Sequence, residues 1–214
     1  MSNYLTENLR TVALVGHGSC GKTSLIEAML YRTGMISELG SIERGNTMCD
    51  NDALEKQVQH SIRLAVAHVD TALPDLTPVR IHVLDTPGYP DYIGQDMSAL
   101  DAVKSVCAVI DATKGVTEQD TKIAGFAHEE GKACIVVVNK WDLVEKGNNT
   151  MKEWREFLES KLAPFNDIPI IFTSVINKQR ILEVLQTAIR VYQNRKRRIL
   201  TSELNEYPVS YTHL

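Results

Sequence analysis

A glycine-rich segment that ends in lysine and threonine carries the strongest chemical signal in the sequence. Residues 16–23 read GHGSCGKT and fit the pattern G-x-x-x-x-G-K-[ST] between an apolar run and a run with helical spacing. Glycines let the backbone N–H groups face phosphate oxygens at a helix N-terminus. Lys22 can reach the terminal phosphates of a nucleotide, and the Thr23 hydroxyl can bind Mg²⁺. The structural alternative is a plain turn between strand and helix. The candidate phosphate-binding residues are Gly16, His17, Gly18, Ser19, Cys20, Gly21, Lys22, Thr23 and Ser24.

A second motif, DTPGYPDY at residues 85–92, follows the apolar run 79–84. The Asp85 carboxylate is expected to hold Mg²⁺ through water, and the Gly88 N–H to bond a terminal phosphate. Taken alone, Asp-Thr-Pro-Gly is also good chemistry for an ordinary turn. Tyr89 stands where a side chain that orients water is often needed, but a phenol is a poor base near pH 7. The sequence therefore leaves two functions open, cleavage of a phosphate and mere binding of one.

Two further loops follow apolar strand-like runs nearer the C-terminus. In the first, residues 139–142 read NKWD, and an Asp142 carboxylate can accept both N1–H and N2–H₂ of guanine. Asn139 belongs to this motif, and the Lys140 stem can cover the base. In the second, Thr173-Ser174-Val175, a backbone N–H of Ser174 or Val175 can bond guanine O6. Solvated loops at strand ends are the structural alternative for both.

Strand-like and helix-like runs alternate along the chain, which predicts an α/β fold with a mostly parallel sheet covered on both faces. The hairpin 62–84 is expected to add one antiparallel edge strand. The expected strands are 11–15, 62–69, 79–84, 106–110, 134–138 and 168–172. The expected helices are 23–32, 94–103, 117–130, 151–162 and a last one carrying the stripe Ile181, Leu185, Ala188, Ile189 and Tyr192.

Residues 33–61 are polar and weakly periodic, and they are too many for an inert connection in a compact domain. A switch loop that orders around a phosphate and Mg²⁺ is one interpretation. A disordered insert is the other.

Composition narrows the class of protein. A formal net charge of −4 gives no bulk attraction to nucleic acid. The basic run 195–198 at the end of the last helix suits the helix dipole, with an RNA phosphate contact as the alternative. Four scattered cysteines predict no metal cluster. The first ten residues lack the apolar segment of a secretory signal, so we expect a cytoplasmic protein that contacts no membrane. We also expect a monomer.

The order of these loops along the chain is typical of a GTP-binding domain, and two families carry the resemblance. Residues about 9–110 resemble the G domain of elongation factor G through NLRTVALVGHGSCGKTSLIEAML, GNTMCDNDALEKQVQHSI and VRIHVLDTPGYPDYIGQ. Residues about 108–206 resemble the second G domain of Der, a ribosome-assembly GTPase, through VIDATKGVTEQDTKIAGFAHEEGKACIVVVNKWDLVEK. We expect one hybrid domain over 1–206 with a junction near 108–120. The tail 207–214, YPVSYTHL, matches neither family.

The resemblance implies a Ras-like P-loop GTPase domain with a six-stranded sheet, GTP or GDP and Mg²⁺ as ligands, and the ribosome or its RNA as partner. It places Ser61 at the switch position that touches Mg²⁺ and phosphate, so the metal candidates are Thr23, Ser61 and Asp85. Lys22, Gly88, Tyr89 and Ser61 are the catalytic candidates. Tyr89 replaces a histidine of most translational GTPases, which predicts slow intrinsic hydrolysis. Ser19 and Val175 also depart from the family patterns. A kinase or ATPase with the same phosphate loop is a further hypothesis.

Overall fold

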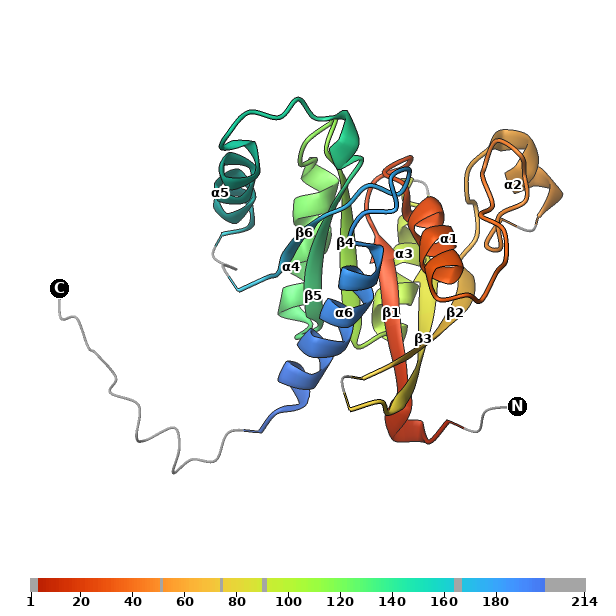
Figure 1. The fold of residues 1–214 in the computed structure, drawn as a ribbon. Coiled ribbons are helices and arrows are strands. Elements are labelled where there is room, and N and C mark those ends of the chain that lie inside the picture. Colours follow the sequence, from red (N-terminus) through yellow and green to blue (C-terminus); the bar gives the residue numbers. More distant parts are fainter. Residues whose placement is uncertain (1–3, 51, 74, 90–91, 164–166, 199–214) are drawn as a thin grey trace.

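The fold is an α/β sandwich built on one six-stranded sheet, seen in a computed structural model that describes residues 4–50, 52–73, 75–89, 92–163 and 167–198 (Figure 1). The strand order is β2-β3-β1-β4-β5-β6; β2 pairs antiparallel with β3, and the other neighbours pair in parallel. This is the mixed sheet that the sequence predicts. The strands are β1 (Leu9–Val15), β2 (Ala65–Ala72), β3 (Pro78–Asp85), β4 (Ser105–Asp111), β5 (Ala133–Asn139) and β6 (Ile170–Phe172).

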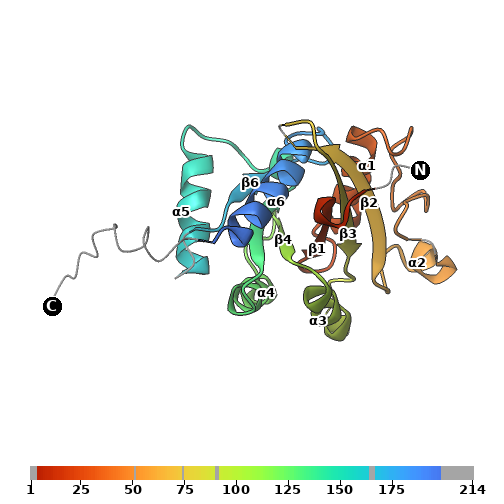
Figure 2. The same cartoon turned by 90° about the horizontal axis from the view of Figure 1, so that it is seen from below.

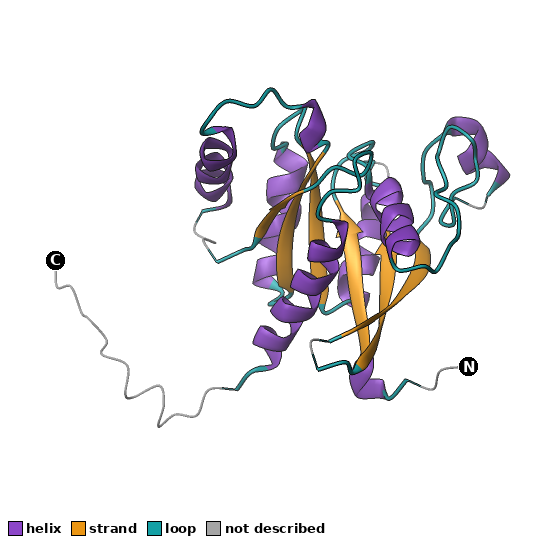
Figure 3. Cartoon of the chain, viewed as in Figure 1, coloured by secondary structure: helices purple, strands orange, loops and turns teal. Residues whose placement is uncertain are grey.

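Helices lie on both faces of the sheet, as Figures 2 and 3 show. The helices are α1 (Lys22–Arg32), α2 (Ala53–Val58), α3 (Ile93–Ala102), α4 (Glu118–Glu129), α5 (Thr150–Leu162) and α6 (Ile181–Lys196), with short 3₁₀ turns η1 (Thr6–Asn8) and η3 (Trp141–Leu143). Helices α1 and α6 share one apolar cluster with the sheet, and α3, α4 and α5 share the other. The described helices include none that is long and apolar enough to cross a membrane.

The central strands explain why the sheet is a rigid base for the loops. Every residue of β4 and of β5 is buried, as expected for parallel strands covered on both faces. Side chains alternate between the two apolar clusters, so that Val137 belongs to the cluster shared with α1 and α6, and Val138 to the cluster shared with α3, α4 and α5. The parallel strands therefore finish at one edge of the sheet in fixed register. These strands are β1, β3, β4, β5 and β6.

Two strands, β2 and β6, begin later than expected for a physical reason. β2 begins at Ala65 rather than residue 62, because side chains capture the preceding N–H groups: Glu55 accepts those of Ile62 and Arg63, and Gln95 accepts that of Leu64. β6 begins at Ile170, since Pro169 has no N–H to give to the sheet. The helical spacing of Phe157 with Trp154 and Leu158 favours a place on the buried face of α5, yet 43% of Phe157 is exposed.

The long segment 33–61 is an arm beside α1 that contains helix α2 (Figure 1). Asp52 and Glu55 form a capping box at the start of this helix, a signal that predicts a helix there and that the weak apolar periodicity obscured. The buried Glu27 of α1 accepts the N–H groups of Gly40 and Met48, which ties the arm to the domain. The arm is therefore folded onto the domain by buried carboxylates.

Other expectations concern the ends of the chain and the cysteines. All four cysteines carry free thiols and are buried, as is usual for cysteines that pack like small apolar residues. At the end of α6, Arg195 donates to the Gly131 carbonyl and Lys196 lies over the Tyr192 ring. Residues 207–214 lie outside the described residues.

Candidate functional site

A cleft of about 480 Å³ opens at the carboxyl ends of the strands, where ligands bind in open α/β sheets. Its lining comes from the phosphate loop, the 33–61 arm, the loop after β3, the loop after β5 and the loop after β6. Of the predicted site residues, Ser19, Gly21, Lys22, Thr23, Ser24, Ser61, Tyr89, Asn139, Lys140, Asp142 and Val175 line the cleft. Gly16, His17, Gly18, Cys20, Asp85, Gly88 and Ser174 do not line it and stand behind these residues.

The phosphate loop is curled around the ammonium group of Lys22. Its Nζ donates to the carbonyls of Gly16 and His17 at 2.9 and 3.1 Å. Gly88, with φ of +77°, approaches so closely that a Cβ there would lie 2.1 Å from Lys22 Nζ. The loop after β3 therefore meets the phosphate loop at Lys22.

The three predicted metal-binding residues meet in one buried cluster. Thr23 Oγ1 donates to Asp85 Oδ2 at 2.6 Å and lies 3.1 Å from Ser61 Oγ. Ser61 in turn donates to Asp50 Oδ1 at 2.7 Å. Asp50 is a buried carboxylate that the sequence reasoning missed, because it stands in the arm without a strand end to mark it.

The chemistry of this cluster fits a divalent cation. Burial raises the pKa of Asp85 to about 7, even though the Thr23 hydroxyl and the charge of Lys22 oppose the rise. Asp85 Oδ1 is buried without a hydrogen-bond partner in the described part of the chain. A buried carboxylate oxygen in this state is stabilised by a nearby cation, and hydroxyl and carboxylate oxygens are the ligands that Mg²⁺ takes.

The loop after β5 is bonded to the phosphate loop. Asn139 Nδ2 donates to the Cys20 carbonyl at 3.0 Å, and Lys140 Nζ donates to the Ser19 carbonyl at 2.9 Å. Lys140 also pairs with Asp111 at 2.6 Å, which lies at the end of β4. Burial alone would raise the pKa of Asp111, but the hydrogen bonds from Lys140 and Thr113 lower it. Asp111 was missed, although its place at the end of a buried strand is the same signal that identified Asp85.

The predicted base-recognition groups stand at the other end of the cleft. The half-buried Asp142 side chain forms no hydrogen bond or ion pair with a described residue. Ser174 is buried and accepts the Asn177 N–H at 3.1 Å, so its hydroxyl shapes the turn rather than the cleft wall. Val175 follows at the wall itself.

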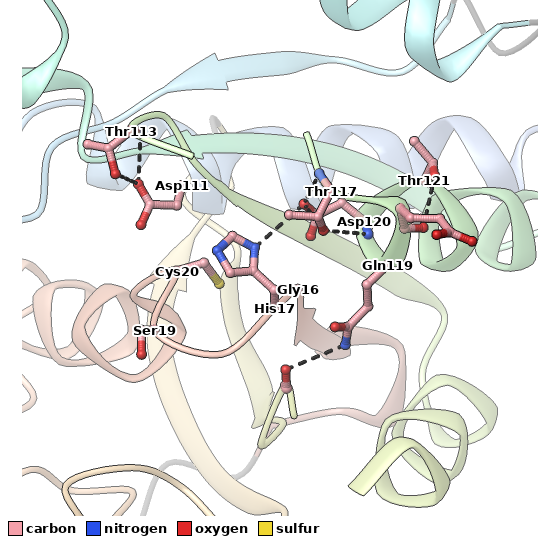
Figure 4. A network of polar contacts seen from close by, with 12 residues as sticks. Gly16, His17, Ser19, Cys20, Asp111, Thr113, Thr117, Gln119, Asp120 and Thr121 are labelled. Atoms are coloured by element: carbon pink, nitrogen blue, oxygen red, sulfur yellow. Dashed lines mark hydrogen bonds and ion pairs between the residues drawn. The ribbon is translucent and has the colours of Figure 1, made fainter. Parts of the chain in front are cut away.

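His17 points away from the cleft toward the first turn of α4 (Figure 4). Its Nδ1 lies 3.5 Å from Asp120, the residue that forms the capping box of α4 with Thr117. Burial alone would raise the pKa of Asp120, but His17 and Thr117 face the carboxylate and hold it below its usual value. In the same turn, Gln119 reaches the Gly88 carbonyl at 3.4 Å. His17 thus braces the phosphate loop against α4.

Tyr89 lies on the phosphate loop rather than in solvent. A Cβ on Gly18 would lie 2.7 Å from Tyr89 Cζ, so the ring covers the Gly18 backbone. The Tyr89 ring also contacts the imidazole of His60 in the arm, with ring centroids 4.7 Å apart. Tyr89 therefore joins the loop after β3 to the arm.

Comparisons with known proteins match this chain to GTP-binding domains and GTPases. The family described as "Elongation factor Tu GTP binding domain" matches residues 7–194. GTPase Der of Alkaliphilus metalliredigens is 34% identical over 206 residues, which is 91% of this chain and 42% of that protein. The chain thus spans less than half the length of this curated relative.

Solved structures share the fold at low sequence identity. A crystal structure of a Thermus thermophilus protein has a TM-score of 0.69 at 20% identity and covers 86% of this chain and 40% of its own. Translation elongation factor SelB from Methanococcus maripaludis, in complex with a GTP analogue, has a TM-score of 0.63 at 21% identity, covering 89% and 35%. With the family match over most of its length, this chain belongs to the GTP-binding domains of the elongation factor Tu family.

Proposed function

We propose that the chain binds GTP with Mg²⁺ and hydrolyses it slowly to GDP and phosphate. One observation carries the proposal: Lys22 and Thr23 of the phosphate loop line the same cleft as Asp142 and Val175 of the loops after β5 and β6. The cleft volume of about 480 Å³ is in the range of sites for small ligands. A guanosine polyphosphate is the ligand that uses a phosphate loop and an unpaired carboxylate together.

Each residue has a part in this reaction. Lys22 would bind the terminal phosphates, and the Gly88 N–H would donate to the outermost one. Thr23, Ser61 and Asp85 would hold Mg²⁺, which when bound neutralises charge on the phosphate oxygens. Water attacks the terminal phosphorus, and the electron pair of the broken bond stays on the bridging oxygen of GDP. Because catalysis here is mostly positioning and electrostatics, these residues support slow turnover without a strong base.

The base end would select guanine through Asp142 and the Val175 N–H. An adenine nucleotide offers no donor pair to Asp142, so it would leave the carboxylate buried and unpaired. Competition between nucleotides therefore separates this proposal from an ATPase or kinase: GDP should displace a fluorescent guanine nucleotide at concentrations where ADP does not.

Release of phosphate from GTP by the purified chain tests the catalytic part. Lys22→Ala should lower turnover about 10²–10³-fold, the usual cost of a lost phosphate or oxyanion donor. Lys122→Ala is the matched control, because Lys122 is an exposed residue of α4 whose ion pair within the described residues is with Glu118. Tight GDP binding without Lys22-dependent turnover would instead identify a binding module.

We also propose that the two family-like halves fold as one domain with a junction near 108–120. The supporting contacts cross that junction: β4 pairs with β5, and Asn139 and Lys140 bond the phosphate loop. Both tryptophans, Trp141 and Trp154, follow the junction, so their fluorescence reports on the second half. Coincident thermal transitions by fluorescence and circular dichroism, both shifted upward by GDP–Mg²⁺, are expected; separate transitions would contradict one domain.

The partner and the location rest on resemblance. The families suggest association with the ribosome or its RNA, in the cytoplasm, and the domain itself should be a monomer. Sedimentation with ribosomes in the presence of a non-hydrolysable GTP analogue, compared with GDP, tests the first point. Light scattering coupled to size-exclusion chromatography tests whether the domain is a monomer.

A further inference from the structure

His60 is a polar side chain of the cleft to which the proposed function gives no task. It lines the cleft, is half-buried, and directly precedes Ser61 in the arm. Ser61 lies 3.1 Å from Thr23, so His60 stands beside the end of the cleft assigned to the terminal phosphate. Hydrolysis there needs a group that orients the attacking water.

Among the described residues that line the cleft, His60 supplies the one imidazole. His17, although in the phosphate loop, faces Asp120 on the other side. His68 and His82 lie opposite each other in β2 and β3, away from the cleft lining. Histidine is the side chain most often used to handle a proton of a reacting group.

Two contacts hold the imidazole in place. Its Nδ1 lies 3.4 Å from the Ser61 carbonyl, an oxygen that only accepts, so this nitrogen carries the proton when the contact forms. The neutral ring then presents Nε2 as an acceptor. The Tyr89 ring, 4.7 Å away by centroids, limits rotation of the imidazole, while Tyr89 itself is packed on Gly18.

We propose that His60 orients the attacking water by accepting a hydrogen bond from it at Nε2, and that Tyr89 positions His60. The water oxygen bonds to the terminal phosphorus, the bond to the bridging oxygen breaks, and that electron pair leaves with GDP. Both protons of the water, including the one that faced Nε2, leave with the released phosphate. This inference rests on the proposed hydrolysis of GTP and assigns the residue that serves it.

Single-turnover and steady-state hydrolysis by His60 variants test the assignment. His60→Phe keeps an aromatic ring against Tyr89 but removes the acceptor, and should lower kcat about 10²-fold with KM and GDP affinity changed less than about threefold. His60→Gln restores an acceptor and should recover at least about tenfold of that loss. His68→Phe, the same exchange on the exposed face of β2, should hydrolyse GTP like the unaltered chain.

The outcomes separate this inference from the function on which it rests. If Lys22→Ala abolishes turnover while His60→Phe retains it, the role of His60 is overturned and the GTPase stands. Equal losses in His60→Phe and His60→Gln, or a rise in KM that accounts for the loss, also overturn it, because a packing role predicts them. A chain that binds GDP but releases no phosphate overturns both. Thermal melts of each variant show whether the fold is kept.

Discussion

At the phosphate end of the cleft, Thr23, Ser61 and Asp85 are buried, and the Thr23 hydroxyl donates to Asp85 and lies 3.1 Å from Ser61 Oγ. At the base end, Asp142 is half-exposed and bonded to no described residue. The first end is shaped by the protein's own hydrogen bonds. The second end keeps its recognition group unpaired for a ligand. Changes at the phosphate end should therefore damage stability and turnover together, and changes at the base end should alter only the choice of nucleotide.

The largest expected effect comes from adding one methyl group at the phosphate end. Gly88→Ala would place a Cβ 2.1 Å from Lys22 Nζ and 2.4 Å from the Gly16 carbonyl, in a backbone with φ of +77° that disfavours alanine. We expect turnover to fall about 10³-fold, because the Lys22 ammonium and the Gly88 N–H both move away from the phosphate. We also expect a loss of about 1–3 kcal/mol of stability from the strained backbone. Phosphate release and urea unfolding measure the two.

Gly125→Ala is the control for this prediction. Gly125 lies in α4, has no neighbouring atom within 4 Å of an added Cβ, and has an ordinary helical backbone. Alanine there should raise stability by about 0.5–1 kcal/mol and leave hydrolysis unchanged. If Gly88→Ala behaves like Gly125→Ala, the loop after β3 does not approach the phosphate loop as closely as the Gly88 distances indicate.

At the base end, Asp142→Asn should change specificity without changing the fold. The amide cannot accept both guanine donors, so GDP affinity should fall about 10²-fold, while a xanthine nucleotide should bind better than it does to the unaltered chain. The free energy of unfolding should stay within about 0.5 kcal/mol of that of the unaltered chain, since the side chain has no protein partner to lose among the described residues. Glu145→Gln, an exposed change three residues on, is the control in the nucleotide titrations.

This contrast also explains what the sequence reveals. Asp85 and Asp142 follow apolar strands, and parallel strands bring their carboxyl ends to one edge, so their convergence is predictable from pattern alone. Asp50 and His60 are not predictable in this way, because the arm brings them beside Ser61 and its path depends on side-chain bonds such as those of Glu27 and Glu55. Local periodicity does not encode such bonds, although the Asp52–Glu55 capping box gives the position of α2.

The smallest expected effect concerns Asp96, a buried carboxylate of α3 behind the phosphate end. Neither oxygen of Asp96 has a hydrogen-bond partner within the described residues. Burial raises the pKa of this carboxyl above its usual value, and the nearby Thr86 and Lys22 only partly oppose the rise. The folded chain therefore holds this proton at pH values where the unfolded chain has released it. Stability from this group is present at acid pH and is lost as the pH rises through the raised value.

Asp96→Asn should therefore be more stable than the unaltered chain above neutral pH, by about 1–3 kcal/mol, because no charge is then buried without a partner. The difference should shrink toward acid pH, where Asp96 is protonated in the folded chain. Asp101→Asn, an exposed change on the same helix, should leave the pH profile of stability unaltered. Urea unfolding at several pH values measures this difference. If Asp96→Asn destabilises the chain equally at every pH, Asp96 has a partner that supports its charge, and the phosphate end is more completely bonded than the contrast with Asp142 supposes.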